Sequence, residues 1–411
     1  MILLKIAVIG CGIAGPAAAL FLRQLGAELT VFDKVANLCP VGAGFLLQPA
    51  GLDVLHRLGL AQSLIAQGAP IVGLYGRNHR GKVVLDLRYK DLVAHHIGLG
   101  MHRAVLYKEL MQTMQVQQIR IINPCEIVGI EQALDKVNLK DAANKVYGPY
   151  DCVVIADGAR SNLRTFVTLK IQVKPYEWGA LWAIGRDQQA QFSKVLEQVY
   201  KRTEIMSGIL PMGYDEAHCL LVSFFWSLKK SSLQHWLDTP FRDWIKYVTS
   251  IWPELADLLA QFSSHKDFSF ASYYDVRVFP WHKQRVVLIG DAAHGMSPQL
   301  GQGANLGLID AKVLFECCKG ADIPTALARY SQERKSQLAY YQQASRFVTP
   351  WFQSSAYPMG ILRDLVHGLL CKTPIIKQQM LLTLACMKTG YFNAMPLDSF
   401  QALFGDQKKP P

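Results

Sequence analysis

The sequence predicts an α/β fold with three parts: a Rossmann-like part, an inserted antiparallel β-sheet part and a C-terminal helical segment. Three observations support this prediction. A β-type run, a glycine-rich turn and a helical run follow one another at the N-terminus. Alternating apolar runs between about residues 174 and 267 are typical of antiparallel strands. Apolar residues recur at helical spacing after residue 346.

Length and composition indicate a folded protein with more than one core. The chain has 411 residues, whereas a single hydrophobic core stops growing near roughly 250 to 300 residues. Half of the residues are hydrophobic and 18% are charged, which describes a globular protein and excludes a disordered one. The net charge of +11 fits either anionic partners or a merely basic, solvated surface. No nucleic-acid-binding motif is recognised.

The cysteines and the N-terminus predict a cytoplasmic protein. Nine cysteines are scattered without paired or metal-ligand spacing, so we expect reduced thiols and no metal site. The apolar run "MILLKIAVIG" is short and has no basic region before it, and we interpret it as a first strand and not as a signal peptide. No window of 18 apolar residues predicts a membrane span.

The first motif is "GCGIAG", which lies between the N-terminal strand and an alanine- and leucine-rich helix. Gly10 permits the tight turn, Gly12 lets the backbone approach a pyrophosphate, and Gly15 lets the helix and the strand pack closely. The backbone at Ile13 and Ala14 opens the helix, whose free N–H groups and partial positive charge favour phosphate oxygens. The motif predicts a dinucleotide site, and at this point both NAD and FAD fit.

An acidic residue follows the second predicted strand, "ELTVF". Asp33 lies 23 positions after Gly10, where a carboxylate accepts hydrogen bonds from an adenosine ribose. Lys34 comes next and is a further candidate for contact with the cofactor. Strand, turn, helix, strand and acid therefore occur in the order that dinucleotide binding requires.

The second motif is "YDCVVIADGARSNLR". Residues 152–156 predict a buried strand, and Asp157 and Gly158 follow its end. Taken alone, this pattern also fits a strand that leaves the core through a polar turn. Arg160 and Arg164 fit either solvated side chains or a site for the phosphates of a nicotinamide cofactor.

The third motif is "RVVLIGDAAHGMSPQLGQGANLGLIDA". Its strand delivers Asp291 to a carboxyl end, where open α/β sheets bind their ligands. The small residues Gly301, Gly303 and Ala304, followed by Asn305, predict a helix start that can stabilise negative charge on a bound group. The motif therefore offers one carboxylate for hydroxyl groups and one positive helix end for an anionic ring edge.

Together, the three motifs resemble the FAD-dependent group A monooxygenases, which have the para-hydroxybenzoate hydroxylase fold. The segments "GAGFLLQPAGLDVLHRLGL" and "MHRAVLYKEL" support the resemblance, which covers most of residues 1–345. It implies three regions: an FAD-binding domain of residues 1–72, 96–173 and 268–345; a substrate-binding β-sheet domain of residues 73–95 and 174–267; and a helical segment of residues 346–411.

The resemblance also implies roles for individual residues. Asp291 would contact the FAD ribitol and pyrophosphate region, Arg103 would reach the pyrophosphate, and Pro298 would lie against the isoalloxazine. Asp33 stands where the family commonly has Glu, a difference of one methylene. His294 fits either a proton-transfer group or a residue that packs after the Asp291 turn. The expected FAD-binding residues are Gly10, Gly12, Ile13, Ala14, Gly15, Asp33, Lys34, Arg103, Asp157, Gly158, Asp291, Gly301, Gly303, Ala304 and Asn305.

The predicted β-sheet domain and the C-terminal segment bear on the substrate and on partners. Aromatic residues are dense in the sheet and favour an apolar, aromatic or polycyclic substrate, although each also fits a sheet core: Tyr176, Trp178, Trp182, Phe224, Phe225 and Trp226. Two helical stretches are expected near residues 232–237 and 241–262. The basic, amphipathic C-terminal segment fits packing on its own protein, a homodimer contact or an anionic membrane surface.

The resemblance implies an enzyme that holds FAD non-covalently. NADH or NADPH would reduce the flavin, and dioxygen would form a flavin C4a-hydroperoxide that hydroxylates the substrate. A substrate-binding acid or base is not identified, since this part of the family varies. A related halogenase usually has a WxWxIP element, which "EWGALWAIG" does not match. A quinone-biosynthesis hydroxylase at the membrane and a flavin-binding accessory protein with a polypeptide partner remain alternatives.

Overall fold

The protein was analysed as a computed structural model, which describes residues 3–38, 44–93 and 96–395. Its first layer is a six-stranded sheet in which each strand is parallel to its neighbour except β18 at one edge. In spatial order the strands are β18 (His282–Lys283), β19 (Val286–Leu288), β12 (Cys152–Ile155), β1 (Lys5–Ile9), β2 (Glu28–Phe32) and β8 (Arg120–Ile122). The predicted Rossmann-like strands are therefore confirmed, and their continuous apolar runs are explained by burial on both faces.

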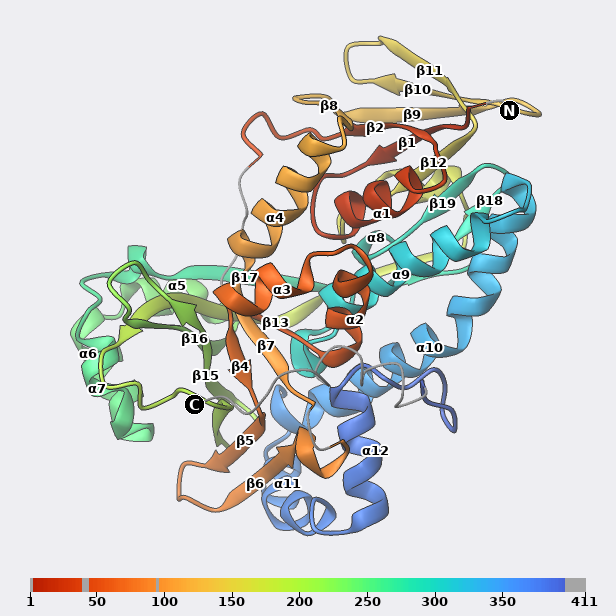
Figure 1. Ribbon diagram of the computed structural model, residues 1–411. Helices are drawn as coiled ribbons and strands as arrows, with labels where there is room; N and C mark the ends of the chain where they lie inside the picture. Colours follow the sequence, from red (N-terminus) through yellow and green to blue (C-terminus); the bar gives the residue numbers. More distant parts are fainter. Residues whose placement is uncertain (1–2, 39–43, 94–95, 396–411) are drawn as a thin grey trace.

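Helices lie on one side of this sheet and a small antiparallel sheet lies on the other (Figure 1). The helices are α1 (Ala14–Arg23), α4 (Arg103–Val116), α9 (Gly303–Cys318) and α10 (Ile323–Phe352); the small sheet contains β9 (Ile127–Gln132), β10 (Val137–Asp141) and β11 (Val146–Tyr150). Helices α1 and α9 pack closely because Gly307 has no side chain: a Cβ there would lie 3.2 Å from the Cβ of Ala14.

A seven-stranded sheet forms the second large layer. Its spatial order is β17 (Ser269–Val278), β13 (Ile171–Asp187), β16 (Leu220–Lys229), β15 (Ile205–Tyr214), β14 (Leu196–Lys201), β5 (Gly73–Asn78) and β6 (Val83–Arg88). All neighbours are antiparallel except β14 and β5. This is the inserted antiparallel sheet that the sequence predicts. The sheet extends past the predicted boundary at residue 267, since β17 is one of its edge strands.

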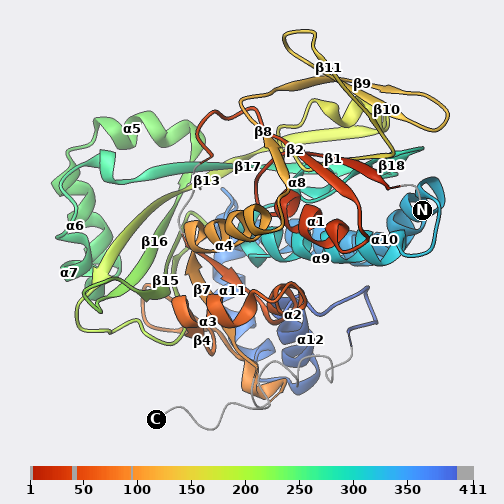
Figure 2. The ribbon, with the colours of Figure 1, turned by 45° about the horizontal axis from the view of Figure 1, so that its top comes forward.

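Three helices cover one face of the seven-stranded sheet (Figure 2). They are α5 (Leu233–Asp238), α6 (Phe241–Ile251) and α7 (Ala256–Leu259). Phe224 and Trp226 are buried in the core on this side, together with Trp244. The helix expected at residues 241–262 is divided, because the backbone of Trp252 before Pro253 leaves the helical region (φ −137°, ψ 83°).

The C-terminal segment is helical, as the sequence predicts. Helix α10 continues through Arg346 and is followed by α11 (Tyr357–Leu370) and α12 (Pro374–Leu384). Both later helices contact β6, and Figure 1 shows them beside the β5–β6 hairpin. The remaining strands and α-helices of the described ranges are β3 (Gly44–Leu47), α2 (Pro49–Arg57), α3 (Ala61–Gln67), β4 (Ala69–Ile71), β7 (Gly98–His102) and α8 (Asp291–His294). Within the described ranges, each helix is too short or too polar to cross a membrane.

Candidate active site

The three glycines of the first motif have different surroundings. Gly10 has a positive φ of 105°, and a Cβ there would lie 2.4 Å from the carbonyl oxygen of Ala156. A Cβ on Gly15 would lie 2.0 Å from the carbonyl oxygen of Gly10. A Cβ on Gly12 would meet nothing within 4 Å. Gly10 and Gly15 are therefore required by the packing of the protein itself, whereas Gly12 faces open space that a ligand can occupy.

Asp33 follows β2 and is held by the backbone around it. Its Oδ2 accepts a hydrogen bond from the N–H of Cys11 (2.7 Å), and its Oδ1 accepts one from the N–H of Val35 (2.8 Å). Each carboxylate oxygen keeps a second lone pair, so the side chain can still accept hydrogen bonds from ribose hydroxyls. Lys34, in contrast, is exposed and lies 4.0 Å from the carboxylate of Glu126.

Arg164 connects the second motif to the third. Its guanidinium is buried and donates hydrogen bonds to backbone carbonyls of both segments, at Ala292 (2.6 Å), Ser161 (2.7 Å), Ala159 (2.9 Å), Gly158 (3.1 Å) and Asp291 (3.4 Å). The donors are thus used within the protein. The structure places Arg164 as a structural residue and leaves Arg160, which is exposed, as the arginine of this motif that can meet a phosphate.

Asp157 supplies an acceptor that the described part of the chain does not use. Its Oδ1 is buried and has no hydrogen-bond partner among the described residues. Burial raises the pKa of this carboxyl, while Ser161 and Arg164 act in the opposite direction. Gly158, the next residue, has a positive φ of 85°. A buried acceptor without a partner is costly unless a ligand or water completes it, so Asp157 fits a site for a hydrogen-bonding ligand.

Asp291 and the start of α9 face each other. A Cβ on Gly303 would lie 3.6 Å from Oδ1 of Asp291, so the carboxylate is directed toward the helix start. The Leu306 N–H donates to the Gln302 carbonyl (2.9 Å), so the N–H groups of the first turn remain for another acceptor. This arrangement provides the carboxylate and the positive helix end that the third motif predicts.

Two amide side chains hold this helix start in place. Asn305 is buried; its Oδ1 accepts from the Gln48 N–H (2.9 Å), and its Nδ2 donates to the Gly301 carbonyl (3.2 Å). The Nε2 of Gln302 donates to the carbonyl of Leu384 at the end of α12 (2.9 Å). The Oε1 of Gln302 is buried without a partner among the described residues. The sequence reasoning did not select Gln302, because its packing against α12 is tertiary.

His294 lies in a buried charge cluster. Its Nε2 is 2.6 Å from Oδ2 of Asp310, and that oxygen also accepts the Gly290 N–H (2.8 Å). The Nε of Arg334 donates to Oδ1 of the same carboxylate (2.7 Å). The His294 side chain is fully buried and does not line the cavity described next. His294 thus packs against Asp310 and lies outside the cavity lining, and its proton-transfer role stays a prediction.

One cavity of about 1550 Å³ joins most of the expected site residues. The expected residues that line it are Gly12, Ile13, Asp33, Arg103, Gly158, Asp291, Pro298, Gly301, Gly303 and Ala304. Those outside its lining are Gly10, Ala14, Gly15, Lys34, Asp157, His294 and Asn305. The three motifs, which are far apart in sequence, thus meet around a single space.

The cavity continues along the seven-stranded sheet. Trp182 and Phe225 line it with their ring centroids 5.1 Å apart, and the Trp182 Nε1–H donates to the hydroxyl of Tyr273 (3.1 Å). Burial raises the pKa of Tyr273 to about 12. The other predicted aromatics are outside the lining. One wall of the cavity was not predicted from the sequence. Helices α10, α11 and α12 supply this wall with Tyr340, Phe347, Val348, Phe352, His367, Ile376, Met380 and Leu384.

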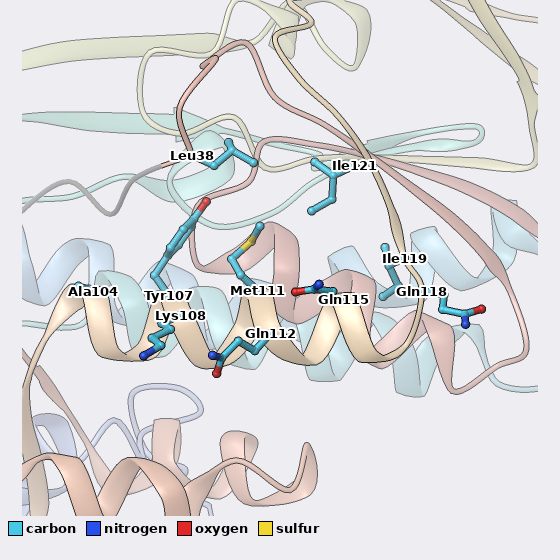
Figure 3. A pocket seen from close by; sticks show the side chains of 10 residues that line it. All are labelled: Leu38, Ala104, Tyr107, Lys108, Met111, Gln112, Gln115, Gln118, Ile119 and Ile121. Atoms are coloured by element: carbon cyan, nitrogen blue, oxygen red, sulfur yellow. The ribbon is translucent and has the colours of Figure 1, made fainter.

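A second hollow of about 760 Å³ runs along α4 (Figure 3). Tyr107 and Met111 extend from this helix toward Leu38, as Figure 3 shows. Leu38 and Tyr107 also line the main cavity, so the two spaces adjoin at the end where Asp33 lies.

Comparisons with known proteins agree with this geometry. A family model described as "FAD binding domain" matches residues 4–345. Among curated proteins, the chain is 25% identical over 357 residues to 2-heptyl-3-hydroxy-4(1H)-quinolone synthase of Pseudomonas aeruginosa, covering 83% of this chain and 90% of the relative. It is 23% identical over 379 residues to 6-hydroxynicotinate 3-monooxygenase of Bordetella bronchiseptica, covering 86% and 93%.

Solved structures share the fold at low sequence identity. Klebsiella pneumoniae HpxO, complexed with FAD and uric acid, aligns with a TM-score of 0.77 at 19% identity over 93% of this chain and 97% of its own. Pseudomonas aeruginosa PqsL, in complex with 2-aminobenzoylacetate, aligns with a TM-score of 0.76 at 17% identity over 87% and 99%. These alignments confirm the predicted fold class.

Proposed function

The chain belongs to the protein family defined by the FAD binding domain that its residues 4–345 match, and on this premise we propose that it is an FAD-dependent monooxygenase that hydroxylates an aromatic small molecule. One observation carries the proposal. A single cavity is lined at one end by the FAD motifs and further along by the aromatic side chains of the seven-stranded sheet.

The residues around this cavity fit FAD. Gly12 leaves open space where a pyrophosphate would pass. Gln302, which lines the cavity, presents a buried acceptor that has no partner among the described residues, and Asp157, which precedes the lining residue Gly158, presents another. When bound, FAD supplies the redox chemistry, accepting reducing equivalents and activating dioxygen. The protein has to bind it, orient it and keep water away from the reacting atoms.

Each of these tasks falls to particular residues. We propose that Asp33 accepts hydrogen bonds from the ribose and that Asp291 accepts them near the ribitol. The free N–H groups at Gly303 and Ala304 would stabilise negative charge on the pyrimidine edge of the isoalloxazine, by roughly 0.3 to 2 kcal/mol as at other helix ends. Pro298 and the aromatic wall would exclude water from the substrate end.

Arg160 is our candidate for contact with the reductant, NADPH or NADH. It lines the cavity and is exposed, whereas the guanidinium of Arg164 is used by backbone carbonyls. The names of the relatives support an aromatic or heteroaromatic substrate, since they include a 2-heptyl-3-hydroxy-4(1H)-quinolone synthase, a 6-hydroxynicotinate 3-monooxygenase and a 3-amino-4-hydroxybenzoate 2-monooxygenase.

We expect a purified, yellow protein that oxidises NADPH or NADH to release a smaller share of hydrogen peroxide when its substrate is bound. The reason is that a ring in the aromatic part of the cavity excludes water from the flavin, which favours transfer of oxygen to the ring over release of hydrogen peroxide. The measurement combines NAD(P)H oxidation, the yield of peroxide and mass spectrometry of the product made under heavy-oxygen gas.

One atom from dioxygen should appear in the product. Release of peroxide with every aromatic compound tested, or label that enters only from water, would contradict the monooxygenase. NAD(P)H oxidation that responds to a protein partner and to no small molecule would favour the accessory role instead.

A hydroxylase that works at a membrane surface is the second candidate. One observation favours it: the outer side of α11 and the start of α12 expose apolar side chains, at Ile361 (65%), Leu365 (55%), Leu369 (65%) and Ile375 (73%). The chain is also basic, which favours an anionic surface. Because α11 and α12 also form a wall of the cavity, an apolar substrate could pass between membrane and site.

This candidate predicts binding to vesicles of anionic phospholipid in a flotation assay. The double variant Leu365→Lys with Leu369→Lys should lose most of that binding, because each exposed leucine then no longer buries apolar area in the lipid. Leu134→Lys, at a leucine that is 98% exposed on a distant turn, is the control and should float like the unchanged protein. Equal binding by all three proteins would contradict a role for α11.

A further inference from the structure

We infer that the substrate is a neutral aromatic compound with an apolar hydrocarbon chain, and that the chain lies between the β5–β6 hairpin and the C-terminal helices. The inference rests on the proposed function, because it concerns the same cavity. We call this part of the cavity the distal subsite and define it by six lining residues: Leu74, Leu85, Leu87, Tyr200, Ile376 and Met380.

Helix α12 shows that the subsite extends away from the flavin end. Leu384, Met380 and Ile376 line the cavity at intervals of four residues, so they share one face of the helix. Eight residues of α-helix span about 12 Å. The Leu384 end is tied to Gln302 beside the glycine turn (2.9 Å). The cavity therefore follows α12 for about two helical turns, a length that suits a hydrocarbon chain attached to a ring.

The walls of the distal subsite are mainly apolar, and the one hydroxyl among its six residues, that of Tyr200, donates to Gln198 (2.5 Å). Leu85 and Leu87 are two residues apart on β6 and so point to the same side of the sheet. Both belong to a buried cluster with Tyr200, Met206 and Phe225, and all of these side chains also line the cavity. Burying a hydrocarbon chain against such walls removes apolar surface from water on both sides, which is favourable in proportion to the area.

Charged side chains are confined to other parts of the cavity. Among the described lining residues they are Asp33, Arg103, Arg160, Asp267 and Asp291. Asp33, Arg103 and Asp291 are expected to bind FAD, and Arg160 is the candidate for contact with the reductant. The carboxylate of Asp267 accepts hydrogen bonds from the N–H groups of Ser263 and Ser264. The distal subsite thus contains no described cation to pair with a carboxylate substrate. An unpaired charge is costly to bury, so a neutral ligand is favoured there.

Two groups near the distal subsite do not change this conclusion. Arg363 is fully buried behind the wall; its guanidinium stacks on the ring of Tyr200 (4.8 Å) and donates to the carboxylate of Asp364 (2.7 Å), so its charge is compensated. His367 lines the cavity between aromatic rings. Burial lowers the pKa of His367, which keeps the imidazole neutral at pH 7.

The test measures binding of neutral phenols of increasing chain length to the FAD-loaded protein. The probes are para-cresol, para-pentylphenol and para-heptylphenol, with para-hydroxybenzoate as the charged probe, and the readout is the change in the flavin absorbance spectrum. We expect Kd to fall by about threefold per methylene, which is close to the value for full burial of a methylene. The charged probe should bind more weakly than para-cresol.

A matched pair of variants locates the chain. Met380→Trp fills the distal subsite and should weaken binding of para-heptylphenol by at least about tenfold while leaving para-cresol within about twofold. Gln378→Trp is the control, because Gln378 is exposed on the same helix and outside the cavity lining. FAD content and thermal stability show whether each variant is folded.

Three results would overturn the inference: a Kd that does not depend on chain length, a spectrum that no phenol changes, or an equal loss for both probes in Met380→Trp. A failure of the proposed function looks different. If para-hydroxybenzoate alone stimulates NAD(P)H oxidation and is hydroxylated, the monooxygenase stands and the neutral, chain-bearing substrate is wrong. If the protein retains no FAD, both proposals are wrong.

Discussion

Gly12→Val is expected to give a folded protein that does not retain FAD. The Cβ of the added side chain would meet no protein atom within 4 Å. Gly12 is not among the glycines with positive φ, so its backbone conformation tolerates a side chain. The side chain would instead fill the space of the pyrophosphate. We expect Kd for FAD to rise by at least about 100-fold, or about 2.7 kcal/mol. Fluorescence titration of the apoprotein with FAD measures this change.

Thermal unfolding of the apoproteins is the control for this prediction. Gly12→Val should unfold within about 0.5 kcal/mol of the unchanged apoprotein, as for other substitutions at open positions. Gly15→Ala should fail to fold normally, because its Cβ would lie 2.0 Å from the carbonyl oxygen of Gly10. Normal FAD affinity in Gly12→Val would contradict the placement of the pyrophosphate.

Asp291→Ala should fold and lose a charge-assisted hydrogen bond to FAD, which weakens FAD binding by about 1.5 to 3 kcal/mol. The same fluorescence titration measures this loss, and an unchanged Kd for FAD would contradict the role of Asp291.

Asp310→Asn is expected to destabilise the protein by about 3 to 5 kcal/mol, the range for breaking a buried ion pair. The substitution keeps the size of the side chain and removes its charge. It leaves Arg334 buried without a counter-charge and weakens the contacts to His294 and to the Gly290 N–H. Denaturant unfolding measures the loss. Glu316→Gln is the control on the same helix, since its half-exposed pair with Lys319 (3.0 Å) is worth no more than about 1 kcal/mol.

The same carboxylate predicts how stability depends on pH. Burial raises the pKa of Asp310, but its interactions with His294 and Arg334 outweigh burial and lower the pKa from 3.8 to about 2. A carboxyl group whose pKa is lower in the folded than in the unfolded protein stabilises the fold at any pH above the unfolded pKa. This stabilisation is lost as the pH falls through the folded pKa. The unchanged protein should therefore lose stability between about pH 4 and pH 2, and Asp310→Asn should lack this component. If the unchanged protein and Asp310→Asn lost the same stability over this pH range, Asp310 would not be the group responsible.

The sequence by itself determined the parts of the site that depend on local order. The strand, turn and helix around Gly12 are encoded by neighbouring residues, and β1, β2 and β12 occur where the sequence predicts them. Asp33 and Asp291 follow strands of one parallel sheet, so their meeting at its carboxyl edge follows from topology. The alternating pattern also predicted the antiparallel sheet, although it did not show that Phe225 faces the cavity while Phe224 and Trp226 face the covering helices.

Only the tertiary structure decided the roles that depend on partners distant in sequence. His294 packs against Asp310 of α9, which Arg334 of α10 also binds, and Arg164 binds backbone carbonyls that include that of Ala292. The wall formed by α11 and α12 was missed for a related reason. A helical pattern shows which side chains share a face, but the element that this face packs against, here β6 and the cavity beside it, is fixed by the whole fold.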